Sequence, residues 1–209
     1  MFVDRKDAGR KLALQFSYLK GQDAVVMAIP RGGVVVAAIV AEELSLPLGL
    51  VIPRKIGAPG NPELAIGAVA GEGVTFLNVE LIRTLNINKE YIDKEVIHQV
   101  EEIKRRQELY LQGRPQPELA GKIAVVIDDG LATGATAIAA TRALRQQNPS
   151  KIILAVPVAP AESRRILEKE VSEVVILQTP PVFYAVGQFY QSFEQTSDEE
   201  VKQLLEARG

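Results

Sequence analysis

Residues 123–136 read IAVVIDDGLATGAT, and the architecture of the chain can be worked out from them. Five apolar residues, most of them β-branched, predict a strand buried on both faces of a parallel sheet. Two acids, Asp128 and Asp129, end this strand, and a loop of small residues leads into a predicted helix that begins near Thr133. Backbone N–H groups and the positive end of the helix dipole therefore face the space beyond the strand, which suits a phosphate group.

The acid pair Asp128 and Asp129 needs a separate role, because two carboxylates would repel a bare phosphate. Carboxylates accept hydrogen bonds from sugar hydroxyls and tolerate a nearby divalent cation, so the whole stretch fits a ribose 5-phosphate. An ordinary strand-to-helix connection with an Asp cap is the alternative, but a cap accounts for one acid and one threonine only. The order of apolar strand, paired acids and Thr-Gly-x-Thr resembles the phosphoribosyl pyrophosphate (PRPP) signature of the type I phosphoribosyltransferases.

This resemblance implies transfer of 5-phosphoribosyl from PRPP to a nitrogen of a small planar base, with release of pyrophosphate. It implies that Asp128 and Asp129 are catalytic and hold the ribose hydroxyls. The implied PRPP-binding loop consists of Ala132, Thr133, Gly134, Ala135 and Thr136. Magnesium is the implied cofactor, bound mainly through PRPP, and no metal ligand is expected among the protein residues.

Length and composition favour one soluble domain over residues 1–209. The chain is 47% hydrophobic, which suffices for one sizeable core, and no long Gly/Ser/Pro linker divides it. The net charge is −2 with acids and bases interspersed, so nucleic acid is not an expected partner. The sequence has no cysteine, no long apolar run and no basic leader. We therefore expect no disulfides and no membrane span, and we expect a cytoplasmic location.

Upstream of the signature, the chain alternates predicted strands and helices, which indicates a doubly wound α/β fold with a mostly parallel sheet. A packing helix is expected over 4–20, strands over 24–29 and 47–52, and a helix over 34–44. Arg31 and Gly32 follow the first strand and resemble the pyrophosphate loop of the same family, although a plain turn is the alternative. Glycine suits that role because the backbone can then approach phosphate oxygens closely.

A flap is expected near residues 53–78. Its first part, 53–63, contains three prolines and two glycines and is predicted to be a loop, and strands over 65–70 and 74–77 form a hairpin beside it. The pair Arg54 and Lys55 resembles the start of the mobile loop of adenine-type enzymes, which implies a catalytic pyrophosphate contact for Lys55, with Arg54 in reserve. A solvated basic turn is the alternative. Glu63 is either a general acid or base or simply solvated.

The second half of the chain completes the sheet and adds a small C-terminal hood near residues 179–194. Predicted helices cover 79–85, 88–112 and 161–169, strands cover 151–156 and 174–177, and a helix capped by Ser197 runs to about Arg208. The hood holds Phe183 and Tyr184, which either stack on the base or pack in the core. His98, the only histidine, lies on the polar side of its helix and is expected to be solvated.

Departures from the family pattern leave the acceptor base unidentified. The position that matches Ala132 is an acid in the 6-oxopurine enzymes, and the strand before Ala161 lacks the lysine that those enzymes use. A regulatory sensor that binds PRPP or a nucleotide without turnover is therefore the alternative function. A homodimer is the expected assembly, because twofold dimers are the commonest oligomers.

Overall fold

The computed structural model describes residues 1–207. In chain order its elements are α1 (Arg5–Ala13), a 3-10 helix (Leu14–Leu19), β1 (Ala24–Ala28), α2 (Gly32–Leu44), β2 (Leu48–Leu50), β3 (Pro53–Ala58), β4 (Asn61–Ala70), β5 (Val74–Leu77), α3 (Val79–Thr84), α4 (Lys89–Leu111), β6 (Ile123–Ile127), α5 (Ala135–Arg145), β7 (Lys151–Val158), α6 (Ala161–Leu167), β8 (Glu173–Gln178), a 3-10 helix (Val186–Phe189) and α7 (Asp198–Glu206).

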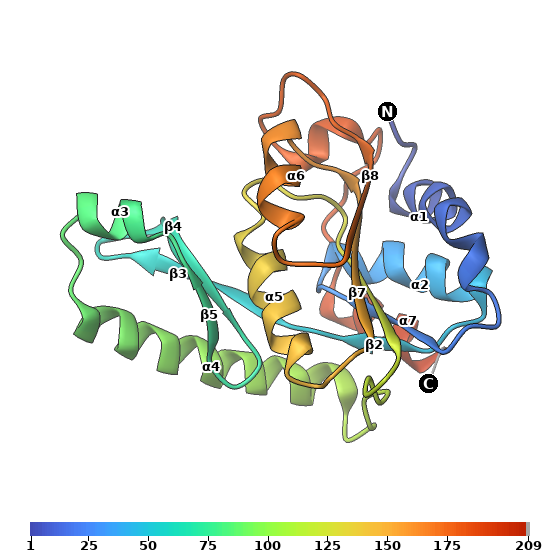
Figure 1. Ribbon diagram of the computed structural model, residues 1–209, viewed down its shortest axis with the longest axis horizontal. Coiled ribbons are helices and arrows are strands. Elements are labelled where there is room, and N and C mark those ends of the chain that lie inside the picture. Colours follow the sequence, from blue (N-terminus) through green and yellow to red (C-terminus); the bar gives the residue numbers. More distant parts are fainter. Residues whose placement is uncertain (208–209) are drawn as a thin grey trace.

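Five strands form a parallel sheet in the order β2-β1-β6-β7-β8, and helices cover both of its faces (Figure 1). Alternate residues of each strand point to opposite faces, so Val26 and Val125 pack with α1 and α2, while Val25 and Val126 pack with α5 and α6. Every residue of β1 is buried, as expected for a strand covered on both sides. The predicted doubly wound α/β fold is confirmed.

The strand order places β1 next to β6, which is the point where the winding of the sheet reverses. Ala28 and Ile127, the last residues of these strands, are paired, and the N–H of Ile29 donates to the Ile127 carbonyl at 2.9 Å. The loops after β1 and β6 therefore leave the sheet side by side. In open α/β sheets, ligands bind in the crevice at this position.

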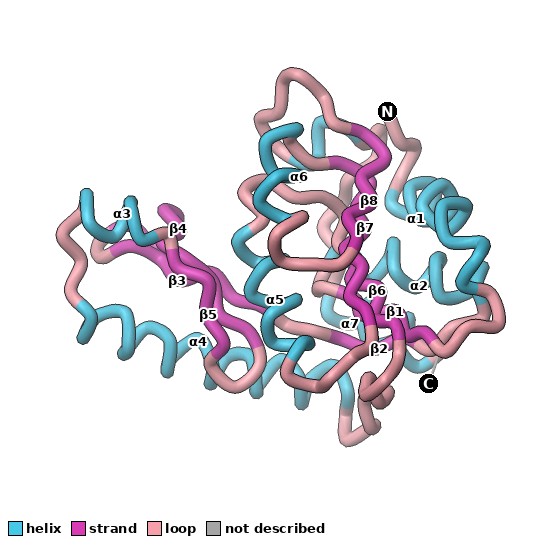
Figure 2. The backbone as a smooth tube through the Cα atoms, in the orientation of Figure 1, coloured by secondary structure: helices cyan, strands magenta, loops and turns pink. Residues whose placement is uncertain are grey.

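A second, antiparallel sheet has the order β3-β4-β5 and lies with α3 and most of α4 to one side of the parallel sheet (Figure 2). It packs on α5 through small side chains, which let the sheet and helix backbones approach closely. This contact is made by Ala68, Ala70, Ala139 and Ala143. We refer to β3, β4 and β5 together as the small sheet.

The prediction of a loop over 53–63 is wrong, because β3 and the start of β4 occupy most of this range. Pro53 is the first residue of its strand, Pro59 and Gly60 form the turn, and Pro62 lies beside a register shift. At these positions a proline does not interrupt the hydrogen-bond ladder. Gly57 approaches the partner strand so closely that a Cβ there would lie 2.7 Å from Cα of Pro62.

Smaller differences concern helix ends. The first helix stops at Ala13 and continues as a 3-10 turn with non-helical torsion angles at Phe16, so the predicted helix over 4–20 is shorter than expected. The last helix begins as predicted, because Oγ of Ser197 accepts the Glu200 N–H at 3.0 Å, and the predicted end at Arg208 lies outside the described residues. The His98 side chain is 70% exposed, as predicted. Within residues 1–207, no helix has the length and apolar character needed to cross a bilayer.

Candidate functional site

Two glycines bring the loop after β1 against the acid pair at the end of β6. A Cβ on Gly32 would lie 1.9 Å from Oδ2 of Asp129, and a Cβ on Gly33 would lie 2.8 Å from Cα of Asp128. Only glycine leaves room for these approaches. The residues Gly32, Asp128 and Asp129, predicted from separate parts of the sequence, therefore lie together.

Two helices begin at this crevice with free positive ends. Both α2 and α5 start without a side-chain cap, whereas Asp4, Asn78, Asn88 and Ser197 cap other helices. Among the α-helices of residues 1–207, only α2 and α5 have no acid in the first turn. Acids normally offset the helix dipole there. The N-termini of α2 and α5 are therefore the helix ends that suit an anion best.

The loop from Ala132 to Thr136 forms the second of these ends. Ala132 and Thr133 are exposed, Ala135 and Thr136 are half-buried, and Gly134 adopts φ +77°, a left-handed conformation that favours glycine. Thr133 and Ala135 also line a cavity of about 420 Å³ that reaches Phe76 of the small sheet and Ile166 of α6. The small sheet therefore borders the predicted phosphate loop.

The two acids differ in their environment. Desolvation raises the pKa of Asp128 well above its ordinary value, and the charge of Asp129 raises it further. The Asp129 N–H donates to Oδ1 of Asp128 at 2.8 Å. Oδ2 of Asp129 lies 2.8 Å from Nε of Arg5, in an ion pair whose two side chains are 12% and 15% exposed. Within residues 1–207, Asp129 therefore has a cation paired with it, whereas Asp128 forms no ion pair.

Arg31 immediately precedes α2 and follows Pro30 through a cis peptide bond. Its Nη1 lies 3.7 Å from Oδ1 of Asp198, the first residue of α7. The same oxygen accepts the Tyr110 hydroxyl at 2.7 Å, and burial together with this bond raises the pKa of Tyr110 to about 12. The Arg31 guanidinium is thus held against the start of the C-terminal helix.

The neighbours Arg54 and Lys55 point to opposite faces of the small sheet. Arg54 donates from Nε to Oε1 of the buried Gln99 on α4 at 2.9 Å, so the reserve role that we assigned to Arg54 is not supported. Lys55 is paired with Ala68 and shares its face, which packs toward α5. Lys55 is exposed on the side of the small sheet that borders the phosphate loop. Glu63 is exposed as well.

The segment 179–194 covers the carboxyl edge of the parallel sheet. Val186 lies over the loop after the acid pair, since a Cβ on Gly130 would come within 2.5 Å of its Cγ1. Tyr184 is 86% exposed, which rules out the core-packing alternative for this residue. Phe183 instead packs on Phe189, with ring centroids 5.1 Å apart. The two predicted base-binding residues therefore lie in different environments.

Three residues of this crevice escaped the sequence analysis. Arg5 pairs with Asp129, Phe193 lies against Arg5, and the Tyr190 hydroxyl donates to the Asp129 carbonyl at 2.5 Å. Burial raises the pKa of Tyr190, so it remains a donor. The sequence predicted only a packing helix for Arg5. The aromatic residues within 189–193 gave a weak indication of a site, because aromatic residues make up only 5% of this chain.

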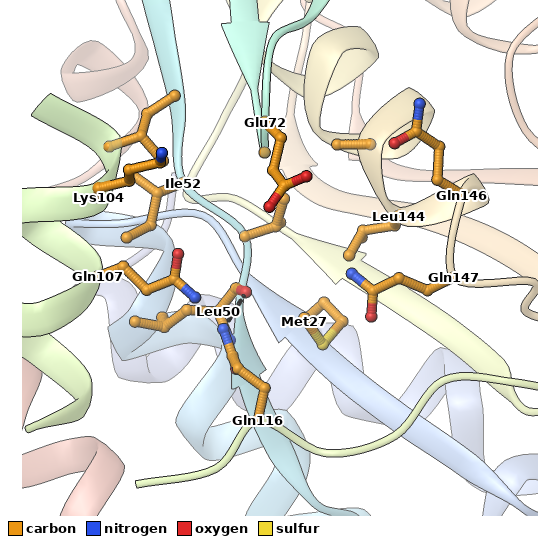
Figure 3. A pocket seen from close by; sticks show the side chains of 14 residues that line it. Met27, Leu50, Ile52, Glu72, Lys104, Gln107, Gln116, Leu144, Gln146 and Gln147 are labelled. Atoms are coloured by element: carbon orange, nitrogen blue, oxygen red, sulfur yellow. Dashed lines mark hydrogen bonds between the residues drawn. The ribbon is translucent and has the colours of Figure 1, made fainter. Parts of the chain in front are cut away.

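A different pocket, of about 430 Å³, lies between the small sheet, α4 and the last turn of α5 (Figure 3). Met27 and Leu50 form part of its floor, and the side chains of Glu72, Lys104 and Gln147 project around it. Because α5 starts at the carboxyl edge of the sheet, its last turn lies at the opposite end. This pocket is therefore separate from the crevice at the acid pair.

The topology defines a doubly wound α/β protein with a crevice at its switch point, and comparison with known proteins identifies the family. Residues 4–193 match the family described as Phosphoribosyl transferase domain, and the chain belongs to that family. Two curated proteins from the CDC 1551 and H37Rv strains of Mycobacterium tuberculosis, provisionally named phosphoribosyl transferases, are each 44% identical to it. Each match covers 99% of this chain and 46% of the relative, so the chain spans about half the length of these relatives.

Solved structures agree with the fold. The crystal structure of TT1426 from Thermus thermophilus is 40% identical in sequence, with a TM-score of 0.83 over 99% of this chain and 98% of that one. The AQ2163 protein from Aquifex aeolicus is 18% identical, with a TM-score of 0.52 over 84% of this chain and 74% of that one. The second likeness concerns the fold alone.

Proposed function

We propose that this protein transfers the 5-phosphoribosyl group of PRPP to a nitrogen of a planar base and releases pyrophosphate. The observation that carries the proposal is the acid pair, flanked by the free ends of α2 and α5. PRPP has the matching order of groups, with hydroxyls between a phosphate and a pyrophosphate. Family membership supports the reaction class.

In the proposed complex each group of PRPP meets one part of the crevice. Asp128 and Asp129 accept hydrogen bonds from the ribose hydroxyls, and the N–H groups of residues 132–136 bind the 5-phosphate. Gly32 and Arg31 bind the pyrophosphate, and Lys55 adds a positive charge from the small sheet. Tyr184, exposed beyond the sheet edge, is the proposed stacking partner of the base, and Phe183 supports it.

In the reaction, the bond from C1 of ribose to a pyrophosphate oxygen breaks and a bond from C1 to a base nitrogen forms. Any proton on that nitrogen is released. The sugar becomes positively charged as the bonds exchange, and the negative charge of the acid pair stabilises it. Positioning of the two reactants supplies the remaining catalysis.

Magnesium fits the donor set of the crevice. Carboxylate oxygens are ligands that Mg²⁺ prefers, and within residues 1–207 no three His, Cys, Asp or Glu side chains are grouped to hold an ion. An ion at the site would therefore take most of its ligands from PRPP and solvent. When bound, Mg²⁺ would neutralise part of the pyrophosphate charge.

A regulatory sensor that binds PRPP without turnover is the second candidate. It is favoured by Ala132, an exposed methyl group where the 6-oxopurine enzymes have an acid. For either function we expect a cytoplasmic homodimer that acts on small molecules.

The test is pyrophosphate release from magnesium PRPP across a panel of purine, pyrimidine and pyridine bases, with Asp129→Asn as the blank. If the wild-type protein releases pyrophosphate with one base and Asp129→Asn does not, the result supports the transferase and identifies its acceptor. No release with any base of the panel, with PRPP still raising Tm, supports the sensor or an acceptor outside the panel. Absence of both responses rejects the two candidates.

A further inference from the structure

Arg5 is held at the acid pair by three contacts. Its Nε donates to Oδ2 of Asp129 at 2.8 Å, its Nη1 donates to the Glu194 carbonyl at 2.7 Å, and its Cζ lies 3.8 Å from the centroid of the Phe193 ring. The side chain is 12% exposed. A charge-assisted bond at this depth is stronger than a surface ion pair, because water competes for it less.

The segment Phe2–Arg5, which we call the N-terminal strap, is itself fixed to the segment 179–194. The Phe2 N–H donates to the Phe189 carbonyl at 2.7 Å, the Phe2 carbonyl accepts the Gln191 N–H at 2.8 Å, and the Phe2 and Tyr190 rings lie 5.3 Å apart. In Figure 1 the N-terminal end lies beside the orange-red chain that follows β8. Tyr190 in turn binds the Asp129 carbonyl.

Asp129 is therefore held twice, by Arg5 at its side chain and by Tyr190 at its backbone. A carboxylate that ends a strand beside a loop of small residues has few packing contacts to fix its rotation. With Oδ2 bound to Arg5, the rotation is fixed and Oδ1 is left to accept a hydrogen bond. Arg5 also offsets the repulsion between the two adjacent acids.

We propose that Arg5 is a positioning residue for Asp129 and that it thereby sets the affinity of the site for the ribose of its ligands. This inference rests on the proposed function, because it takes Asp129 to be a ribose contact. It makes the N-terminal strap a part of the substrate site.

The experiment compares the wild-type protein with Arg5→Gln by calorimetric titration of three ligands, each with Mg²⁺: PRPP, ribose 5-phosphate and pyrophosphate. We expect ribose 5-phosphate and PRPP to lose affinity by the same factor, about 10-fold to 100-fold, the usual effect of losing a hydrogen bond between charged groups. Pyrophosphate affinity is expected to stay unchanged. Arg5→Lys keeps the charge but cannot bind both Asp129 and Glu194, so its loss should be intermediate.

The control is Arg10→Gln, which removes an exposed arginine from the same helix and should leave all three affinities unchanged. A double-mutant cycle adds a second readout. In the Asp129→Asn background, Arg5→Gln should cause no further loss of ribose 5-phosphate affinity, because no carboxylate is left to position. A merely structural role for Arg5 would lower all three affinities and would persist in that background.

Three results would overturn the inference while leaving the proposed function standing. Unchanged ribose affinity in Arg5→Gln would show that Asp129 needs no support. Tighter ribose binding would make Arg5 a competitor for Asp129, and a loss confined to pyrophosphate and PRPP would make it a pyrophosphate ligand beside Gly32. If the wild-type protein binds neither PRPP nor ribose 5-phosphate, the proposed function itself fails, and the inference fails with it.

Discussion

Gly32 and Asp129 lie in contact across the switch point, so that a Cβ on Gly32 would come within 1.9 Å of Oδ2 of Asp129 and 2.6 Å of Nε of Arg5. The backbone at the start of α2 thus takes the space beside the acid pair. For this reason the proposed pyrophosphate and ribose contacts are adjacent, just as the pyrophosphate and ribose groups are adjacent in PRPP.

Gly32→Ala should therefore abolish PRPP binding, because the new methyl group must displace the Asp129 side chain or the start of α2. The measurement is the rise of Tm with magnesium PRPP. Gly21→Ala is the control, since Gly21 has φ +76° in open space and its replacement adds backbone strain of about 1–2 kcal/mol without a clash. A normal PRPP response in Gly32→Ala would contradict the close contact.

Asp128→Asn should stabilise the protein at neutral pH. Because the folded-state pKa of Asp128 is raised, the wild-type protein is more stable below the unfolded pKa and loses stability as pH rises through the folded value. The variant escapes this loss, so its Tm advantage should grow from pH 4 to pH 8. Each kcal/mol recovered corresponds to about 2–4 °C at this chain length.

Asp129→Asn is the matched comparison for that experiment, because it breaks the ion pair and leaves the Arg5 cation, only 12% exposed, without its carboxylate. It should lower Tm at pH 8 or leave it unchanged. Equal stabilisation by both substitutions would show that the two acids share one environment. Turnover should be lost in both variants.

The sequence was sufficient for the parallel sheet and for the acid pair because these depend on local signals. An apolar strand, two acids and a small-residue loop lie within fourteen consecutive positions, 123–136. The pyrophosphate contact predicted for Gly32 stays a prediction, while its lack of a side chain is what allows its close approach to Asp129. Each of these features is encoded where it acts.

The sequence was insufficient where contacts join distant parts of the chain. Arg5 meets Asp129 in a part of the chain where Phe2 also pairs with Tyr190, and no local pattern indicates either contact. The strands over 53–63 were missed for another reason. Their prolines resemble loop residues, but they lie at the first residue of a strand, in the turn and beside a register shift, where a strand tolerates proline.

Lys55→Ala and Arg54→Ala should have opposite effects, although the residues are neighbours on β3. Lys55 is exposed on the face toward α5, so its loss should weaken pyrophosphate and PRPP binding and leave Tm unchanged. Arg54 binds the buried Gln99, so its loss should cost about 1–3 kcal/mol of stability without a change in ligand affinity. Titration calorimetry and thermal unfolding separate the two outcomes. Equal ligand affinity in Lys55→Ala and wild type would remove Lys55 from the proposed site.

Tyr184→Ala should change KM for the base, without changing Tm or the Kd for PRPP. The side chain is 86% exposed, so its removal leaves the core intact and Tm should not change. If the ring stacks on the acceptor, the loss of stacking should raise KM for the base by about 5-fold to 100-fold, while the Kd for PRPP stays the same. Tyr18→Ala, at a tyrosine that is 52% exposed in the 3-10 helix after α1, is the control and should leave both constants unchanged. An unchanged KM for the base in Tyr184→Ala would move base recognition to other residues of the segment 179–194, with Phe193, which lies beside Arg5, as the next residue to replace.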